Sequence, residues 1–281
     1  MGEKLITMEK VEEFKTFLIA EEKAENTVGK YMRDVRAFAA WQGRQPVTKE
    51  KVVEYKAKLL DSGYAKGSVN SMLVSLNRFF CFLSWHELRV KTLKLQRQIY
   101  CPEEKDLSWQ EFERLIQAAR SGGDERLEML LQTIVATGVR VSELRFITVE
   151  AAKSGAAAVS LKGKTRPVII VKKLKKLLLS YARKRNIVSG PIFITRSGRP
   201  MSRTNVWREM KRLCEKAGVS PSKVFPHNLR HLFARIFYRA KQDIVKLADV
   251  LGHASIETTR LYVISTGAEH RKYLESLPLI M

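Results

Sequence analysis

Residues 225–262 read FPHNLRHLFARIFYRAKQDIVKLADVLGHASIETTRLY. His227 and Arg230 lie within one helical turn of each other, so they share one face of a helix that opens at the preceding proline. His253 and Tyr262 follow on the far side of an apolar segment. Two imidazoles, a guanidinium and a phenol can bind one phosphate, move protons around it and attack it. If a second arginine and a proton donor for the leaving oxygen come from elsewhere in the chain, these groups suffice for the transesterification of a phosphodiester.

The spacing resembles the second half of the active site of the tyrosine recombinases, the phage integrase and Xer group. That family shows His-x-x-Arg, then Leu-Gly-His, then a tyrosine nine residues after this histidine. His227, Arg230, His253 and Tyr262 fill the same places. The resemblance implies that Tyr262 is the nucleophile, that Arg230 binds the phosphate and that His253 donates to a non-bridging oxygen. It implies that His227 either donates to the phosphate or takes the tyrosine proton.

A second motif lies at residues 136–147, which read ATGVRVSELRFI. It is similar to the ATG-x-R-x-SEL pattern of the same family, which implies that Arg140 is the first catalytic arginine and that Glu143 orients charged neighbours. Judged by spacing alone, Arg140 and Glu143 also fit a weak surface ion pair. Two arginines would offer the non-bridging oxygens a fork geometry that lysine lacks.

Residues 156–171 read AAAVSLKGKTRPVIIV and predict two short strands around a basic turn. In the family that this chain resembles, such a hairpin carries a lysine that protonates the leaving 5′ oxygen. Xer-like relatives read GKGNKER at this point, whereas LKGKTR is one residue shorter. Alignment on Lys-Gly makes Lys162 the general acid, and the shortened turn leaves Lys164 as an alternative. Either lysine also fits a basic turn that merely attracts phosphate.

No metal or other cofactor is expected. His227 and His231 are four positions apart and form a candidate metal pair, but no acidic residue gives them an HExxH-like context. The implied reaction keeps the bond energy in a 3′-phosphotyrosyl link and hydrolyses nothing. It therefore requires neither ATP nor a divalent metal.

Composition indicates a polyanionic partner. The 281-residue chain carries 51 Lys and Arg against 29 Asp and Glu, a net charge of +22, and the excess is spread along its length. Such a charge favours nucleic acid, and the resemblance makes that partner double-stranded DNA. No apolar run reaches the ~18 residues of a membrane span, and no signal-peptide pattern opens the sequence. Three scattered cysteines indicate reduced thiols, so we expect a cytoplasmic protein without membrane attachment.

The hydrophobic pattern predicts a mainly α fold with one small β-hairpin. Residues 1–95 contain four amphipathic helices, and the resemblance implies that they form an N-terminal core-binding (SAM-like) bundle. Residues 96–105 hold a proline and several charges and are interpreted as a linker. Residues 106–281 form the predicted catalytic domain. The positions expected to face the core of the bundle are Val11, Phe14, Leu18, Val28, Tyr31, Val35, Phe38, Val52, Val53, Tyr55, Leu59, Val69, Met72, Leu76, Phe79, Phe80 and Leu83.

Local signals predict where some elements begin. Asn26 or Thr27 is expected to cap the second helix. Ser108 and Glu111 are spaced as a capping box, so ordered structure should restart there after the linker. Residues 192–194 are expected to form a short buried strand.

The C-terminal residues 268–281 read AEHRKYLESLPLIM and are strongly apolar at their end. Such a tail has to be buried, either against its own domain or against another subunit. The resemblance favours the second arrangement, because relatives pass the terminal helix to a neighbouring protomer in a cyclic exchange. We therefore expect a monomer in free solution and a tetrameric synapse on DNA, in which assembly is coupled to the placement of Tyr262.

The sequence thus predicts a site-specific DNA recombinase that integrates, excises or resolves DNA of a mobile element or chromosome. One alternative is a type IB topoisomerase, which shares the site and relaxes supercoils alone; the compact size and the apolar tail argue against it. Another is a DNA-binding regulator that keeps the fold without the chemistry. Such a regulator would lack a catalytic residue, and none of the family positions is missing here.

Overall fold

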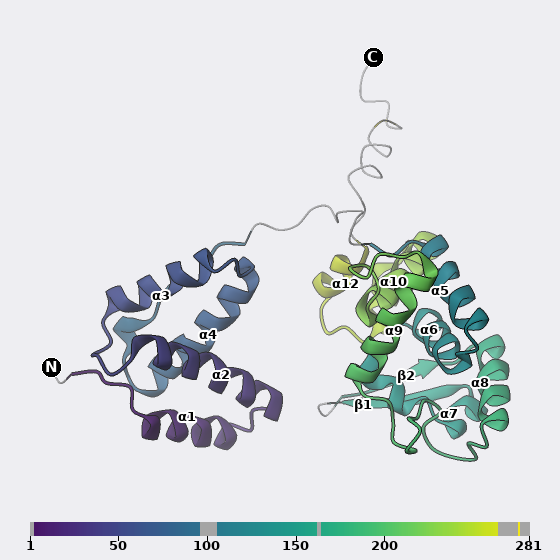
Figure 1. Cartoon of the computed structure of the whole chain (residues 1–281), viewed down its shortest axis with the longest axis horizontal. Coiled ribbons are helices and arrows are strands. Elements are labelled where there is room, and N and C mark those ends of the chain that lie inside the picture. Colours follow the sequence, from purple (N-terminus) through teal and green to yellow (C-terminus); the bar gives the residue numbers. More distant parts are fainter. Residues whose placement is uncertain (1–2, 96–105, 162–163, 264–274, 276–281) are drawn as a thin grey trace. The chain divides into compact units, whose positions relative to one another are not determined.

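The computed structural model describes residues 3–95, 106–161, 164–263 and 275 (Figure 1). The chain divides into two compact units, Met1–Arg97 and Gln98–Met281. The linker expected at residues 96–105 lies outside the described residues, as does the exchange tail at 268–281 apart from residue 275. Among the helices that are described, none has both the length and the hydropathy that a membrane crossing needs.

The N-terminal unit is the predicted bundle of four helices. Its elements are α1 (Met8–Ala20), α2 (Glu25–Gln42), α3 (Lys49–Asp61), α4 (Lys66–Phe82) and the short 3-10 helix η1 (His86–Leu88). Thr7 and Thr48 cap α1 and α3 through their side-chain oxygens. In contrast, α2 begins after Ala24 without any side-chain cap, so the expected cap at Asn26 or Thr27 is wrong.

Aromatic rings fill much of the core of this bundle. Phe14 packs edge-on against Phe79 at 5.1 Å between ring centroids, and Phe38 does so against Phe80 at 5.9 Å. Most positions expected to face the core are buried. Val53 is not, because α3 turns its neighbours at Val52, Tyr55 and Leu59 inward and leaves Val53 exposed. Val53 lies about 100° around the helix from Val52, on the side of α3 that faces away from the core.

The second unit is helical around one β-hairpin (Figure 1). Its elements are α5 (Trp109–Ser121), α6 (Glu125–Thr137), the 3-10 helix η3 (Val141–Phe146), α7 (Val149–Ser154), β1 (Ala156–Leu161), β2 (Lys164–Ile169), α8 (Lys172–Lys184), α9 (Arg203–Ala217), α10 (Pro226–Lys241), α11 (Ile244–Leu251) and α12 (Ile256–Val263). The two strands pair antiparallel, with a register that runs from Ala156 opposite Ile169 to Leu161 opposite Lys164. The predicted hairpin is therefore present.

The starts and ends of the elements follow local chemistry in several places. Ser108 and Glu111 form the predicted capping box at the start of α5. Helix α6 ends at Gly138, whose φ of 64° lies in the left-handed region that glycine adopts without strain. The strand expected at 192–194 is wrong. Pro191 and Ile194 make only isolated bridges, and the chain between them is held by burial of its apolar side chains.

Candidate active site

Helix α10 presents His227 and Arg230 on one face, one turn inside its N-terminus. Pro226 occupies the first turn, where a missing backbone N–H costs nothing. Arg230 is only 1% exposed. Its Nη1 donates to the carbonyl of Gly138, and its Nη2 donates to the carbonyl of Leu251 at 2.7 Å. The guanidinium therefore ties the end of α6 to the end of α11.

The same guanidinium fixes the protonation of His253. Arg230 Nη2 lies 2.9 Å from His253 Nε2, and His253 Nδ1 lies 2.9 Å from Thr259 Oγ1. Because a guanidinium only donates, Nε2 must accept, and the ring proton of the neutral imidazole then sits on Nδ1 and is donated to Thr259. Thr259 is fully buried. Sequence reasoning missed it, although it lies one helical turn before Tyr262.

Tyr262 is 7% exposed and lies among three imidazoles. The centroid of its ring is 4.2 Å from that of His231, 4.8 Å from that of His253 and 5.1 Å from that of His227. The Cζ of Arg230 is 5.7 Å from the centroid of the tyrosine ring. Four of the predicted site residues, from α10, α12 and the turn between α11 and α12, thus converge.

His231 is a further residue of this cluster that the sequence suggested only as half of a metal pair. Its ring stacks on that of Tyr262 at an interplanar angle of 26°. Its Nε2 is buried and has no hydrogen-bond partner within the described part of the chain. In the same part of the chain, no group of three or more His, Cys, Asp or Glu is arranged to hold a metal ion. The helical spacing of His227 and His231 therefore places both rings against a phenol.

Arg140 and Glu143 form an ion pair of an unusual kind. Arg140 Nη1 lies 2.8 Å from Glu143 Oε1, and the backbone N–H of Arg140 donates to Glu143 Oε2 at 2.8 Å. Glu143 is 1% exposed, whereas the Arg140 side chain remains partly open to solvent. The pair is therefore no ordinary surface pair, because a buried carboxylate holds a guanidinium that can still reach a ligand.

Arg166 on β2 also binds Glu143, and the sequence analysis did not identify it as part of the site. Its Nη2 lies 2.7 Å from Glu143 Oε2, and its Nη1 donates to the carbonyl of Val250 at 2.8 Å. Burial by itself would raise the pKa of the Glu143 carboxyl. The N–H of Arg140 and the guanidiniums of Arg166 and Arg140 outweigh burial and lower that pKa, so Glu143 is ionised near neutral pH.

The histidines of the site are neutral at pH 7. Burial, followed by the charge of nearby groups that include Arg230, lowers the pKa of His231 and of His253 to about 4. The pKa of His227 is lowered by partial burial and then by the charges of Arg230 and Arg140. The pKa of Arg230 is lowered to about 10, first by burial and then by Arg140. Guanidiniums therefore supply the positive charge of the site at pH 7, and the imidazoles are neutral.

Only one of the two lysines predicted as the general acid lies among the described residues. Lys162 lies outside the described residues, and Lys164 is the first residue of β2, paired through its backbone with Leu161. The choice between Lys162 and Lys164 stays a prediction.

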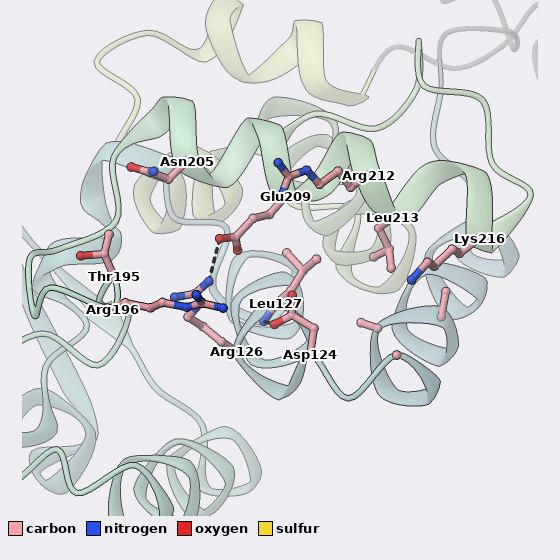
Figure 2. Close-up of a pocket in the computed structure, with 13 residues that line it drawn as sticks. Asp124, Arg126, Leu127, Thr195, Arg196, Asn205, Glu209, Arg212, Leu213 and Lys216 are labelled. Carbon is pink, nitrogen blue, oxygen red and sulfur yellow. Dashed lines mark hydrogen bonds and ion pairs between the residues drawn. The ribbon is translucent and has the colours of Figure 1, made fainter.

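A hollow of about 710 Å³ lies elsewhere in this unit, between α5, α6 and α9 (Figure 2). Arg126 crosses it, with Nη2 2.7 Å from Glu209 Oε1 and Nη1 3.0 Å from the carbonyl of Ile194. None of the predicted catalytic residues lines this pocket. The Arg126–Glu209 ion pair lies within this hollow, and the lining residues do not include any of the cluster around Tyr262.

Two family models match the chain. The phage integrase family matches residues 105–269, and the phage integrase N-terminal SAM-like domain matches residues 11–87. Among curated proteins, tyrosine recombinase XerA of Pyrococcus furiosus is 30% identical over 290 residues, which cover 100% of this chain and 98% of the relative. Tyrosine recombinase XerD of Vibrio cholerae is 28% identical and covers 85% of this chain and 85% of the relative.

Solved structures agree. A structure of XerA recombinase aligns at 28% identity with a TM-score of 0.55, over 98% of this chain and 100% of that chain. A lambda integrase dimer bound to a COC′ core site has 19% identity and a TM-score of 0.75, over 92% of this chain and 78% of that chain, and shows the shared fold.

A phenol beside a buried guanidinium and neutral imidazoles forms a candidate phosphoryl-transfer site of the tyrosine type. The chain belongs to the phage integrase family. Its activity is that of a site-specific tyrosine recombinase, and the family and fold class predicted from the sequence are confirmed.

Proposed function

We propose that this chain cuts and rejoins double-stranded DNA through a 3′-phosphotyrosyl link on Tyr262. The observation that carries the proposal is the convergence of the Tyr262 ring with Arg230 and with the rings of His227 and His253. The phenol oxygen attacks the scissile phosphorus, the bond to the 5′ oxygen breaks, and the 5′ oxygen leaves with a proton. A 5′-hydroxyl of the partner strand later reverses the step, so no water is consumed and no energy source is needed.

The residues around the phenol accept its proton and bind the negatively charged phosphate oxygens. The hydroxyl of a tyrosine has a pKa near ~10, so it needs a base at neutral pH. His227, neutral and in ring contact with Tyr262, takes this proton in the proposed mechanism. Arg140 and Arg230 bind the non-bridging oxygens, an effect of several kcal/mol when donors are preorganised. Arg230 Nε is buried without a hydrogen-bond partner among the described residues, so a phosphate oxygen would satisfy it.

His253 can donate a hydrogen bond to the same phosphate only when its Nε2 carries a proton. Its Nε2 accepts from Arg230 in this structure, so donation to a non-bridging oxygen requires a proton on Nε2. Thr259 fits both forms, because a hydroxyl can accept from Nδ1–H or donate to bare Nδ1.

The protonation of the leaving oxygen is assigned to Lys162, with Lys164 as the alternative. The assignment rests on the family resemblance of the hairpin. Replacement of the 5′ bridging oxygen by sulfur gives a leaving thiolate that needs no acid. Cleavage by the alanine variant of the true acid should therefore be restored on the sulfur substrate, and cleavage by the other alanine variant should change little on either substrate.

The proposed partners are double-stranded DNA and further copies of the chain. The matches to an N-terminal SAM-like domain and to a lambda integrase bound to its core site support DNA contact by both units. We assign residues 1–95 to the core-binding domain, 96–105 to the linker and 106–281 to the catalytic domain. The apolar tail at 268–281 passes to a neighbour in a tetrameric synapse, formed on DNA by a protein that is monomeric in solution. We also propose a cytoplasmic location, in which such a protein would meet its DNA.

The test uses a library of nicked duplexes with randomised sequence, from which covalent protein–DNA adducts are recovered under denaturing conditions and sequenced. The wild-type chain should enrich one family of sites, and Tyr262→Phe should give no adduct while folding normally. An adduct that survives in Tyr262→Phe, or its absence with the wild-type chain at every site in the library, would overturn the proposal.

A further inference from the structure

We propose that Arg166 is a positioning residue, which holds Arg140 and the turn before His253 as one unit. The inference rests on the proposed function, because it concerns residues assigned there to the phosphate. Arg166 lies on β2, far in sequence from both partners, and its side chain is only 15% exposed.

The contacts of Arg166 join three segments. One arm of its guanidinium reaches the Glu143 carboxylate in η3, and the other reaches the carbonyl of Val250 near the end of α11. Glu143 in turn binds both the side chain and the backbone N–H of Arg140. A movement of the α11 end relative to η3 would break one of the two contacts of Arg166.

The backbone of Gly252 packs closely against the Arg166 side chain. Its φ is +64°, and a Cβ added there would lie 2.2 Å from Cδ and 2.5 Å from Nε of Arg166. The arginine therefore lies directly against the backbone of the residue that precedes His253. A Cβ at this position would displace either the turn or the guanidinium, so the glycine of the Leu-Gly-His motif has a packing reason in addition to its conformation.

Arg166 also keeps Arg140 available. Glu143 Oε2 accepts from Arg166 Nη2 and from the Arg140 backbone, so the Arg140 side chain is bound only at Oε1. Without Arg166, Oε2 would keep the bond from the Arg140 backbone and could accept a second one from the Arg140 side chain, which gives the parallel two-bond pair that arginine and carboxylate prefer. Arg140 would then turn its remaining donors from the phosphate to Glu143. One carboxylate shared by two guanidiniums leaves a net positive charge on this group of three side chains.

Arg126 offers a matched control in the same unit. It too binds a carboxylate, that of Glu209 (Figure 2). It also donates to the carbonyl of Ile194, and its side chain is 24% exposed. Arg166→Ala and Arg126→Ala therefore remove similar contacts, but only Arg166→Ala removes contacts to Glu143 and to the turn before His253. Arg166→Lys retains the charge but replaces the fork by a point donor.

The first measurement needs no DNA. Hydrogen exchange should speed up at the amides of Arg140 and His253 together in Arg166→Ala, because these amides are bonded to Glu143 and to Ala248 in the two segments that Arg166 joins. Arg126→Ala should leave both rates unchanged. Unchanged exchange in Arg166→Ala, or faster exchange at only one of the two amides, would overturn the inference, whatever the protein does to DNA.

The second measurement uses the nicked duplex recovered from the library. Arg166→Ala should lower the single-turnover rate at saturating DNA by roughly 10²-fold, the scale of one lost transition-state donor, with little change in duplex affinity. Arg166→Lys should recover only part of this loss, and Arg126→Ala should cleave at the wild-type rate. Full recovery in Arg166→Lys, or a loss in affinity instead of rate, would refute the positioning role. Failure of the wild-type chain would instead refute the proposed function.

Discussion

Gly138 offers a direct test of how tightly the site is built. Its φ is +64°, and an added Cβ would lie 2.5 Å and 2.8 Å from ring atoms of Phe233 and 2.9 Å from Leu251 Cδ2. Its carbonyl accepts from Arg230. Gly218 is a matched control, because it also ends a helix at positive φ and accepts from an arginine, Arg114, but has nothing within 4 Å of an added Cβ.

Both alanine variants bear the cost of a left-handed residue, roughly 1–2 kcal/mol. Gly138→Ala also has to push aside Phe233 and Leu251, which adds about 1–3 kcal/mol for an overpacked core. Since 1 kcal/mol shifts the melting temperature of a domain of this size by about 2–4 °C, Gly138→Ala should melt at least ~2 °C below Gly218→Ala.

The assay is thermal unfolding of the full-length variants followed by circular dichroism, together with adduct formation on the nicked duplex. Gly138→Ala should also slow adduct formation, because the carbonyl that binds Arg230 moves with the backbone. Gly218→Ala should form adducts at the wild-type rate. Equal melting temperatures for the two variants would refute the claim that Gly138 is tightly enclosed.

Three further outcomes are expected. Thr259→Val should leave His253 Nδ1–H without an acceptor, so it should destabilise the protein by about 1–3 kcal/mol and slow cleavage. Thr259→Ser retains the hydrogen bond and serves as the control. Equal melting temperatures and equal cleavage rates for the two variants would contradict this expectation. The pKa values of His231 and His253 are about 4 in the folded protein against 6.5 for free histidine, so the unfolded chain binds more protons between these values. The free energy of unfolding should therefore fall as pH drops from about 6.5 to about 4, and His231→Asn should flatten that fall in denaturant titrations; a pH-independent stability would contradict it. Given the net charge of +22, affinity for a generic duplex should drop by roughly 10³-fold or more between ~50 and ~200 mM salt, measured by fluorescence anisotropy; a flat salt response would exclude an electrostatic interface.

The sequence predicted the elements whose signals are local. The His227 and Arg230 pair needed only the period of a helix, and the capping box at Ser108 needed only a spacing of three residues. The start of α2 was misplaced because no side chain caps it, so packing of the bundle fixes its first turn. The strand at 192–194 was predicted from apolar residues, which are buried here without a continuous ladder of backbone hydrogen bonds.

The residues that sequence reasoning missed act over long separations. Arg166 and Val250 are 84 positions apart, and no periodicity relates them. His231 and Thr259 lie inside recognised motifs, yet their roles depend on which face of α10 meets α12, and that depends on tertiary packing. The placement of residues within one motif was therefore predictable, whereas the contacts between motifs were not.

The position of Tyr262 within α12 has a mechanical consequence. The helix has only eight residues, and the tyrosine is its penultimate one. A helix this short has marginal stability without its packing. Tension on the chain after Val263 would therefore act directly on the last turn, because only one residue separates Tyr262 from the end of the helix. Force applied from outside the subunit would then draw the phenol away from the three imidazoles that surround it.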